Sequence, residues 1–199
     1  MNKGRSLPND YLEIVSKQYN KTKHALPHIE KEIGFFIYDY ILTKKIKSIL
    51  EIGTCLGYST IFMGSAIKEN NGKILTIEKN EDLFWKAKSN IKKANLSKNV
   101  DMLCADACEV LPNLTKKYDL VFQDSQKSLY LEMLEVSINL LKKGGTLIAD
   151  DTLLYLTNPY KNIKRSIYDY NRVVFSNPML DSTIIPLGDG ITVSIKKEG

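Results

Sequence analysis

The sequence is poor in the residues that build disulfide frameworks and zinc sites. Its 199 residues include only three cysteines and two histidines. An odd number of cysteines, with no matching pair of cysteines or histidines nearby, argues against both kinds of site. We therefore expect reduced thiols that serve in packing, at Cys55, Cys104 and Cys108.

Long apolar runs are also missing. No stretch approaches the roughly 20 apolar residues that a helix needs to cross a bilayer. The first residues, Met1 to Ser6, are polar and lack the hydrophobic centre of a signal peptide. We expect a cytoplasmic protein that does not insert into a membrane.

Neither sign of charge dominates the chain. The 28 lysines and arginines exceed the 23 acidic residues by five, a mild excess that fits solubility and permits an RNA partner without indicating one. The length and the 43% hydrophobic content are typical of a single globular domain. We predict one domain over residues 1–199, with an N-terminal helical cap (1–45) and a core (46–199).

One stretch looks like a ligand-binding turn. The apolar run 48–52 is interrupted by Gly53 and Gly57, after which residues 58–67 resume with helical spacing. This pattern is typical of a buried strand that turns into a helix. Glycines allow a ligand to approach the backbone, and the N-terminus of the following helix offers unpaired N–H groups.

The spacing around this turn indicates a nucleoside. A dinucleotide fingerprint reads G-x-G-x-x-G, whereas here three residues separate Gly53 from Gly57, which disfavours an NAD dehydrogenase. Glu78 ends the next apolar run 21 residues after Gly57, where doubly wound folds place a carboxylate on ribose hydroxyls. A nucleoside whose tail carries an amino group would suit both Glu51 and Glu78.

Strand and helix patterns alternate over about 100 residues, which predicts an α/β fold with a doubly wound parallel sheet. Strands are expected at 48–52, 73–78, 99–106, 118–124 and 146–150, and helices at 29–42, around 83–91 and at 129–141, the last stopped by a basic cap at 142–145. A further helix is expected within 9–21, and the runs 181–187 and 191–195 read as a closing antiparallel hairpin. Acids close the strands and should share one sheet edge, namely Glu51, Glu78, Asp106, Asp124 and Asp150.

Three of the acidic side chains can form a cation site. Asp124 follows one predicted strand, and the pair Asp150 and Asp151 follows the next. Carboxylate oxygens suit Mg²⁺ or Mn²⁺ and leave coordination positions for substrate and water. Without Asp124, the alternative interpretation of Asp150 and Asp151 is that one is an ordinary loop residue and the other caps a helix.

Two of these regions resemble the same family. Residues 50–59 resemble the first motif of S-adenosylmethionine (SAM) methyltransferases, and are most similar to the metal-dependent catechol and caffeoyl-CoA O-methyltransferases. The spacing Asp124-x-x-Lys127-x-x-Tyr130 resembles that family's Asp-x-x-Lys-x-x-Tyr motif, and residues 148–154 resemble its Ala-Asp-Asn-Val-Leu motif. The similarity covers about residues 26–197.

The resemblance implies a Rossmann-like, seven-stranded methyltransferase sheet whose last strand is reversed, N-terminal helices, and commonly a homodimer. It implies metal ligands at Asp124, Asp150 and Asp151, with Lys127 as the catalytic lysine beside Asp124. The implied SAM-binding residues are Glu51, Gly53, Thr54, Gly57, Tyr58, Ser59, Glu78, Asp106, Ala107 and Asp124. Asp151 departs from the family pattern, which has Asn there, so the site would carry one more negative charge.

The expected reaction is methyl transfer to a hydroxyl that lies next to a second oxygen. A catechol meets this requirement, and so does 5-hydroxyuridine with its 4-carbonyl. Residues 26–32 and 170–191 resemble the bacterial branch that includes tRNA 5-hydroxyuridine methyltransferase. The stretch 153–162 is short compared with the insertion usual in the acyl-CoA branch, which suggests a more open site. We therefore favour 5-hydroxyuridine in tRNA over a small catechol. A protein that binds SAM or a nucleotide without catalysis is the alternative from another class.

Overall fold

The computed structural model describes residues 28–157 and 160–198. The helix expected within 9–21 lies outside these residues. The helix expected at 29–42 is α2, Lys31–Thr43, whose buried stripe includes Ile33, Ile37 and Ile41. Among the helices described, none is both long and apolar enough to span a bilayer.

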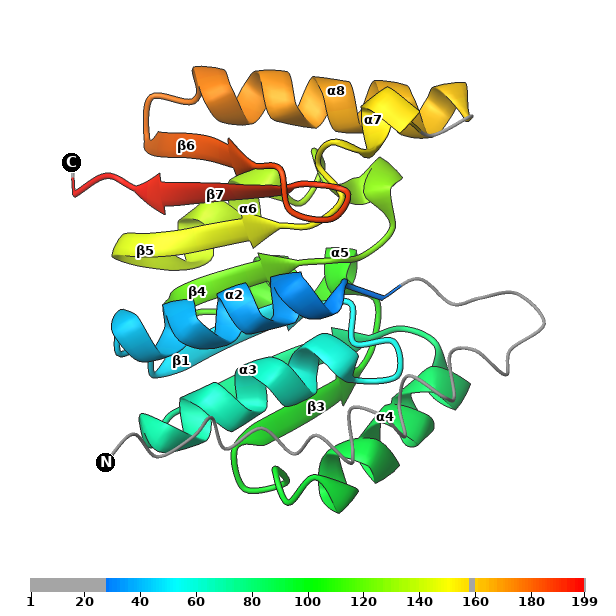
Figure 1. The fold of residues 1–199 in the computed structure, drawn as a ribbon, viewed down its shortest axis with the longest axis vertical. Helices are drawn as coiled ribbons and strands as arrows, with labels where there is room; N and C mark the ends of the chain where they lie inside the picture. Colours follow the sequence, from blue (N-terminus) through cyan, green and yellow to red (C-terminus); the bar gives the residue numbers. More distant parts are fainter. Residues whose placement is uncertain (1–27, 158–159, 199) are drawn as a thin grey trace.

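The described residues form a seven-stranded sheet in the order β3-β2-β1-β4-β5-β7-β6 (Figure 1). All neighbours from β3 to β5 are parallel, whereas β7 runs antiparallel to both β5 and β6. The predicted α/β fold with a reversed last strand is confirmed. The strands are β1 Ser48–Ile52, β2 Lys73–Glu78, β3 Val100–Cys104, β4 Tyr118–Gln123, β5 Leu141–Ala149, β6 Leu180–Ile185 and β7 Ile191–Lys196.

Helices cover both faces of the sheet because the central strands are apolar on both sides. Ile49 of β1 packs in one hydrophobic cluster, whereas its neighbour Leu50 packs in the other. This is the alternation that a strand buried on both faces requires. The first cluster includes residues of α2, α3 Tyr58–Glu69 and α4 Glu81–Lys93, and the second includes residues of α5 Ala107–Val110, α6 Leu134–Leu140 and α8 Lys161–Ser176.

Two predictions in the second half of the chain are wrong in detail. The helix expected at 129–141 is shorter, because α6 begins only at Leu134 and is preceded by a 3₁₀ turn, η2 Lys127–Leu129. The residues 142–145, expected to cap a helix, belong to β5. Leu141 pairs with Tyr118, and the register then shifts before Leu120. Gly144, at φ 71°, lies in this irregular stretch.

Helix α8 is an element for which no prediction was made. The helix could have been found from the spacing of Ile163, Ile167, Tyr170 and Val174, of which the last three are buried. Figure 1 shows α8 running beside β6, with the short helix α7 Leu154–Thr157 close to its beginning. This arrangement brings α7 and the start of α8 to the side of the sheet on which β4 and β5 end.

Candidate active site

The carboxyl ends of the parallel strands surround a hollow of about 170 Å³. Five of the predicted cofactor residues line it: Gly53, Glu78, Asp106, Ala107 and Asp124. They come from four different strand ends, so only the parallel sheet brings them together. A mainly apolar hollow with a few carboxylates at its border is a typical small-ligand site.

The other predicted cofactor residues do not line this hollow. Glu51 is fully buried, and its two carboxylate oxygens accept hydrogen bonds from Ser59 Oγ and Thr60 Oγ1, both at 2.6 Å. Thr54 is hydrogen-bonded through its hydroxyl to Thr76. In the structure these groups tie β1, β2 and the start of α3 together.

Tyr58 and Gly57 also shape the turn between β1 and α3. The Tyr58 ring is buried against Phe62, with ring centroids 5.4 Å apart, and its centroid lies 5.1 Å from that of the His28 ring. Gly57 precedes α3 in a left-handed conformation at φ 85°. Glycine adopts this conformation at little cost, so the chain can enter the helix abruptly.

Gly53 allows the turn after β1 to touch the end of β4, its neighbour in the sheet. Its φ is 98°, and a Cβ atom there would lie 2.3 Å from the Asp124 carbonyl oxygen. Backbone cannot yield at such a distance, so any side chain would push β1 and β4 apart. Gly53 therefore places the ligand-binding turn directly against the main chain of Asp124.

Glu78 is held in place by the turn that it faces. Its Oε2 accepts a hydrogen bond from Cys55 N at 2.8 Å, and its Oε1 accepts one from Asn80 N at 2.9 Å. An ionised carboxylate has about four acceptor positions, so each oxygen retains capacity for one more donor. Glu78 thus keeps free acceptor capacity at the border of the hollow.

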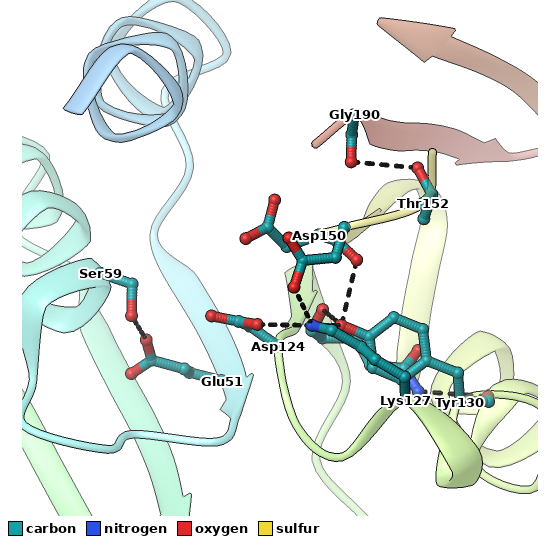
Figure 2. A network of polar contacts seen from close by, with 10 residues as sticks. Glu51, Ser59, Asp124, Lys127, Tyr130, Asp150, Thr152 and Gly190 are labelled. Atoms are coloured by element: carbon teal, nitrogen blue, oxygen red, sulfur yellow. Dashed lines mark hydrogen bonds and ion pairs between the residues drawn. The ribbon is translucent and has the colours of Figure 1, made fainter. Parts of the chain in front are cut away.

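The three predicted metal ligands meet at the same edge of the sheet. Asp124, Asp150 and Asp151 each offer a carboxylate oxygen, and these oxygens lie within 4.8 Å of one another. Lys127 lies among them, with Nζ 2.9 Å from Asp124 Oδ1 and 2.8 Å from Asp151 Oδ2. Figure 2 shows Asp124 and Lys127, which follow β4, converging with Asp150, which follows β5.

Tyr130 fixes the position of Lys127. The lysine Nζ donates to the Tyr130 hydroxyl at 2.8 Å, and this hydroxyl donates to the carbonyl of Gln123 at 2.9 Å. Burial alone would lower the pKa of Lys127, but Asp124, Tyr130, Asp151 and Asp150 outweigh it, so the pKa lies well above its ordinary value. Lys127 is therefore a protonated ammonium group in this arrangement.

Asp150 is the clearest sign that the cluster suits a cation. Only 2% of it is exposed, and its Oδ1 has no hydrogen-bond partner among the described residues. Burial, Asp124 and Asp151 raise its pKa well above the ordinary value. A buried carboxylate oxygen without a donor, next to two further carboxylates, matches the oxygen donor set of Mg²⁺ or Mn²⁺.

Asp151 depends on the hairpin at the end of the chain. Its φ is 59°, a left-handed conformation that Asp and Asn tolerate better than most residues. The next two backbone N–H groups, of Thr152 and Leu153, donate to the carbonyls of Gly190 and Asp189, both at 2.8 Å. The turn between β6 and β7 therefore holds the loop that carries Asp151, a support that sequence reasoning missed.

Several residues around the hollow were also missed. Lys79 follows Glu78, and Ser125 and Gln126 follow Asp124, so their position after predicted strands was the available signal. Leu129 and Met133 reach the hollow from η2 and the turn after it. Their apolar side chains resemble ordinary core residues in the sequence, and only the tertiary structure assigns them to the site.

Solved structures of methyltransferases share this fold. The O-methyltransferase TomG of Streptomyces achromogenes, solved with SAM, superposes with a TM-score of 0.85 at 20% identity, over 94% of this chain and 90% of that one. An O-methyltransferase of Bacillus cereus, solved with S-adenosylhomocysteine (SAH), has a TM-score of 0.82 at 23% identity, over 94% and 91%. The architecture is thus that of the α/β methyltransferases.

Sequence relatives then define the family. Residues 6–197 match the O-methyltransferase family. A caffeoyl-CoA O-methyltransferase of Medicago sativa is 30% identical over 80% of this chain and 71% of that protein. A catechol O-methyltransferase of Niastella koreensis is 29% identical over 76% and 74%. The chain belongs to the O-methyltransferase family, as the sequence motifs predicted.

The first testable consequence concerns Glu51. Burial raises its pKa to about 7, even though the Ser59 and Thr60 hydroxyls act to lower it. The folded protein therefore binds this proton more tightly than the unfolded chain, so the stabilisation is complete below pH 4.5 and is lost as the pH rises toward 7. Glu51→Gln should flatten the pH dependence of the free energy of unfolding, by about 2 to 3 kcal/mol between about pH 5 and pH 8.

Chemical denaturation at the two pH values provides the measurement. Glu135→Gln is the matched control, because Glu135 is exposed on α6. Equal pH dependence in wild type and Glu51→Gln would show that Glu51 does not titrate in this range.

Proposed function

We propose that the protein is a SAM-dependent O-methyltransferase that uses a divalent cation and methylates a hydroxyl adjacent to a second oxygen. The observation that carries this proposal is the convergence of Asp124, Asp150 and Asp151 on Lys127, beside a hollow suited to a nucleoside. Asp124 belongs to both regions, so a methyl donor in the hollow would lie next to a substrate at the carboxylates.

The residues around the hollow fit the parts of SAM. Glu78 has acceptor capacity for two ribose hydroxyls. Asp106 and Ala107, at the end of β3, would contact the adenine, and Gly53 lets the methionine end approach the backbone. The structural relatives solved with SAM or SAH support this choice of cofactor.

The carboxylate cluster fits a divalent cation held by Asp124, Asp150 and Asp151. When bound, Mg²⁺ or Mn²⁺ would orientate two neighbouring substrate oxygens, lower the pKa of the reacting hydroxyl, and offset the negative charge that keeps Lys127 protonated. Lys127 is the base in this proposal. Tyr130 keeps the amine of Lys127 beside the carboxylates. There the amine can take the proton of the reacting substrate hydroxyl.

The proposed substrate is 5-hydroxyuridine in tRNA, which would yield 5-methoxyuridine. Its 5-hydroxyl and 4-carbonyl form the vicinal oxygen pair, and the motif similarity at both ends of the sequence favours the bacterial tRNA branch. A small catechol is the second candidate, favoured by the name of the relative from Niastella koreensis. Both candidates use the same Lys127 and carboxylates.

The SAM assignment can be tested at Glu78. Replacing Glu78 by Gln should weaken SAM binding about tenfold, because the site loses a charged acceptor for ribose hydroxyls. Isothermal titration calorimetry measures the affinity, and circular dichroism checks that the fold persists. Asp82→Asn, an exposed change in the first turn of α4, should leave the affinity unaltered. SAM affinity that survives in Glu78→Gln would remove this residue from the binding site.

The cation assignment predicts dependence on Mg²⁺ or Mn²⁺. EDTA should abolish methyl transfer without unfolding the protein, and either ion should restore it. Asp150→Ala should also lose Mn²⁺ binding, measured by electron paramagnetic resonance with the metal alone. Asp151→Asn should be tolerated, since Asn retains an oxygen ligand and adopts the left-handed conformation found here. Full activity in EDTA would refute the cation mechanism.

The two candidate substrates are separated by direct assay. With SAM and Mg²⁺, tRNA that contains 5-hydroxyuridine should gain a methyl group, detected by mass spectrometry of its nucleosides, and a simple catechol should have a much lower kcat/KM. The larger substrate makes remote contacts that position the reacting hydroxyl. Efficient turnover of catechol with untouched tRNA would assign the small-molecule activity instead and leave the roles of SAM, the cation and Lys127 intact.

A further inference from the structure

Exposed aromatic and apolar side chains gather next to the carboxylate cluster. Leu156 of α7 is 61% exposed, Tyr160 is 65% exposed, and Tyr168 of α8 is 53% exposed. Helix α7 begins three residues after Asp151, and Figure 1 places it where the strands of the sheet end. Large apolar side chains that are exposed to solvent beside a reaction site are typical of a ligand-binding surface.

Tyr168 is held in a defined orientation. Its ring packs edge-on against that of Tyr155 from α7, with centroids 6.2 Å apart and planes at 65°. The contact joins the two helices, and more than half of Tyr168 still remains exposed. A ring that is fixed by a neighbour and open to solvent can stack on a planar ligand at little entropic cost.

Basic side chains share the helix face of Tyr168. The residues Lys161, Lys164, Tyr168 and Arg172 follow one another at intervals of three or four, so they form one stripe along α8. The buried residues Ile167, Tyr170 and Val174 occupy the other side. Beside the stripe, Arg165 is paired with Asp169 at 2.6 Å, so the stripe itself retains its positive charge.

We propose that this stripe of α8 binds the unpaired RNA nucleotides that flank the methylated base, an inference that rests on the tRNA substrate proposed above. Tyr168 stacks on a neighbouring base, and Lys161, Lys164 and Arg172 contact phosphates. An aromatic ring with cations on both sides of it matches single-stranded RNA, which presents base faces and phosphates in turn. Phe175, which is 51% exposed and follows Arg172 by three residues, adds a second exposed ring at the end of the same helix face.

Binding of a labelled RNA stem-loop, with an anticodon-sized loop, tests the proposal by fluorescence anisotropy. Tyr168→Leu should weaken binding about tenfold, whereas Tyr168→Phe keeps the ring and should bind like wild type. The double variant Lys161→Gln/Lys164→Gln should reduce the slope of log affinity against log salt by about 1.4, because two phosphate contacts are lost.

Trp85 provides a matched control. It is 56% exposed and lies beside Lys88, 4.8 Å from the ring centroid, but belongs to α4. Trp85→Leu should leave RNA binding unchanged. An equal loss of affinity in Trp85→Leu and Tyr168→Leu would overturn the proposal, because it would show unspecific attraction to exposed aromatics.

Other outcomes separate this inference from the proposed function. RNA binding that is insensitive to Tyr168→Leu, or equally tight for a duplex without a loop, would overturn the stacking role and leave the tRNA substrate standing. If wild-type protein binds no RNA but methylates catechol, the stripe and the tRNA substrate both fail, and cation-dependent methyl transfer survives. Loss of binding to phosphatidylserine vesicles, but not to RNA, in the lysine variant would assign the stripe to membranes and overturn the proposal.

Discussion

The close approach of Gly53 to the main chain of Asp124 is the constraint on which the site depends. It sets the turn after β1 directly against the end of β4, at a distance that excludes any side chain at position 53. The hollow suited to a nucleoside and the carboxylate cluster thereby become neighbours, with Asp124 in both. A methyl donor and an acceptor oxygen must lie almost in contact, and in the proposed function this backbone contact would provide the proximity.

Like charges are concentrated at this edge, and the protein compensates for them locally. Lys127 bridges Asp124 and Asp151. The Tyr130 hydroxyl accepts a hydrogen bond from the lysine and donates one to the carbonyl of Gln123. Within the described part of the chain, no group donates a hydrogen bond to the buried Asp150 Oδ1. Such an arrangement costs stability in the absence of a cation, which is common at sites where binding or chemistry has priority over stability.

Many of the lysines lie far from the carboxylate cluster. At the opposite end of the sheet, a hollow of about 470 Å³ is lined by Lys117, Lys142, Lys143, Lys196 and Lys197, and the nearby hollow at Lys44 and Lys45 shares two of these lysines. The net charge of +5 is therefore not spread evenly over the molecule. At the edge that carries the carboxylates, Lys127 lies between Asp124 and Asp151, and Lys79 lines the hollow.

Much of this structure follows from local patterns in the sequence. Strands buried on both faces appear as short apolar runs, and the acid after each run was expected at the common edge, as for Glu78 and Asp124. The motif spacing from Asp124 to Tyr130 also indicated the O-methyltransferase family, which residues 6–197 match. These features depend on neighbours in the chain, so they can be recognised without a structure.

Other features depend on segments that are distant in the sequence. The hydrogen bonds from Thr152 and Leu153 to the β6–β7 turn, and the packing of Tyr155 on Tyr168, join residues whose proximity no local pattern records. The same holds for Glu51, which was expected at the ligand but bonds Ser59 and Thr60 behind the turn. Composition and spacing determined the family and the strand ends of this protein, whereas tertiary packing decided which side chains line the hollow, because their orientation is set by contacts across the sheet.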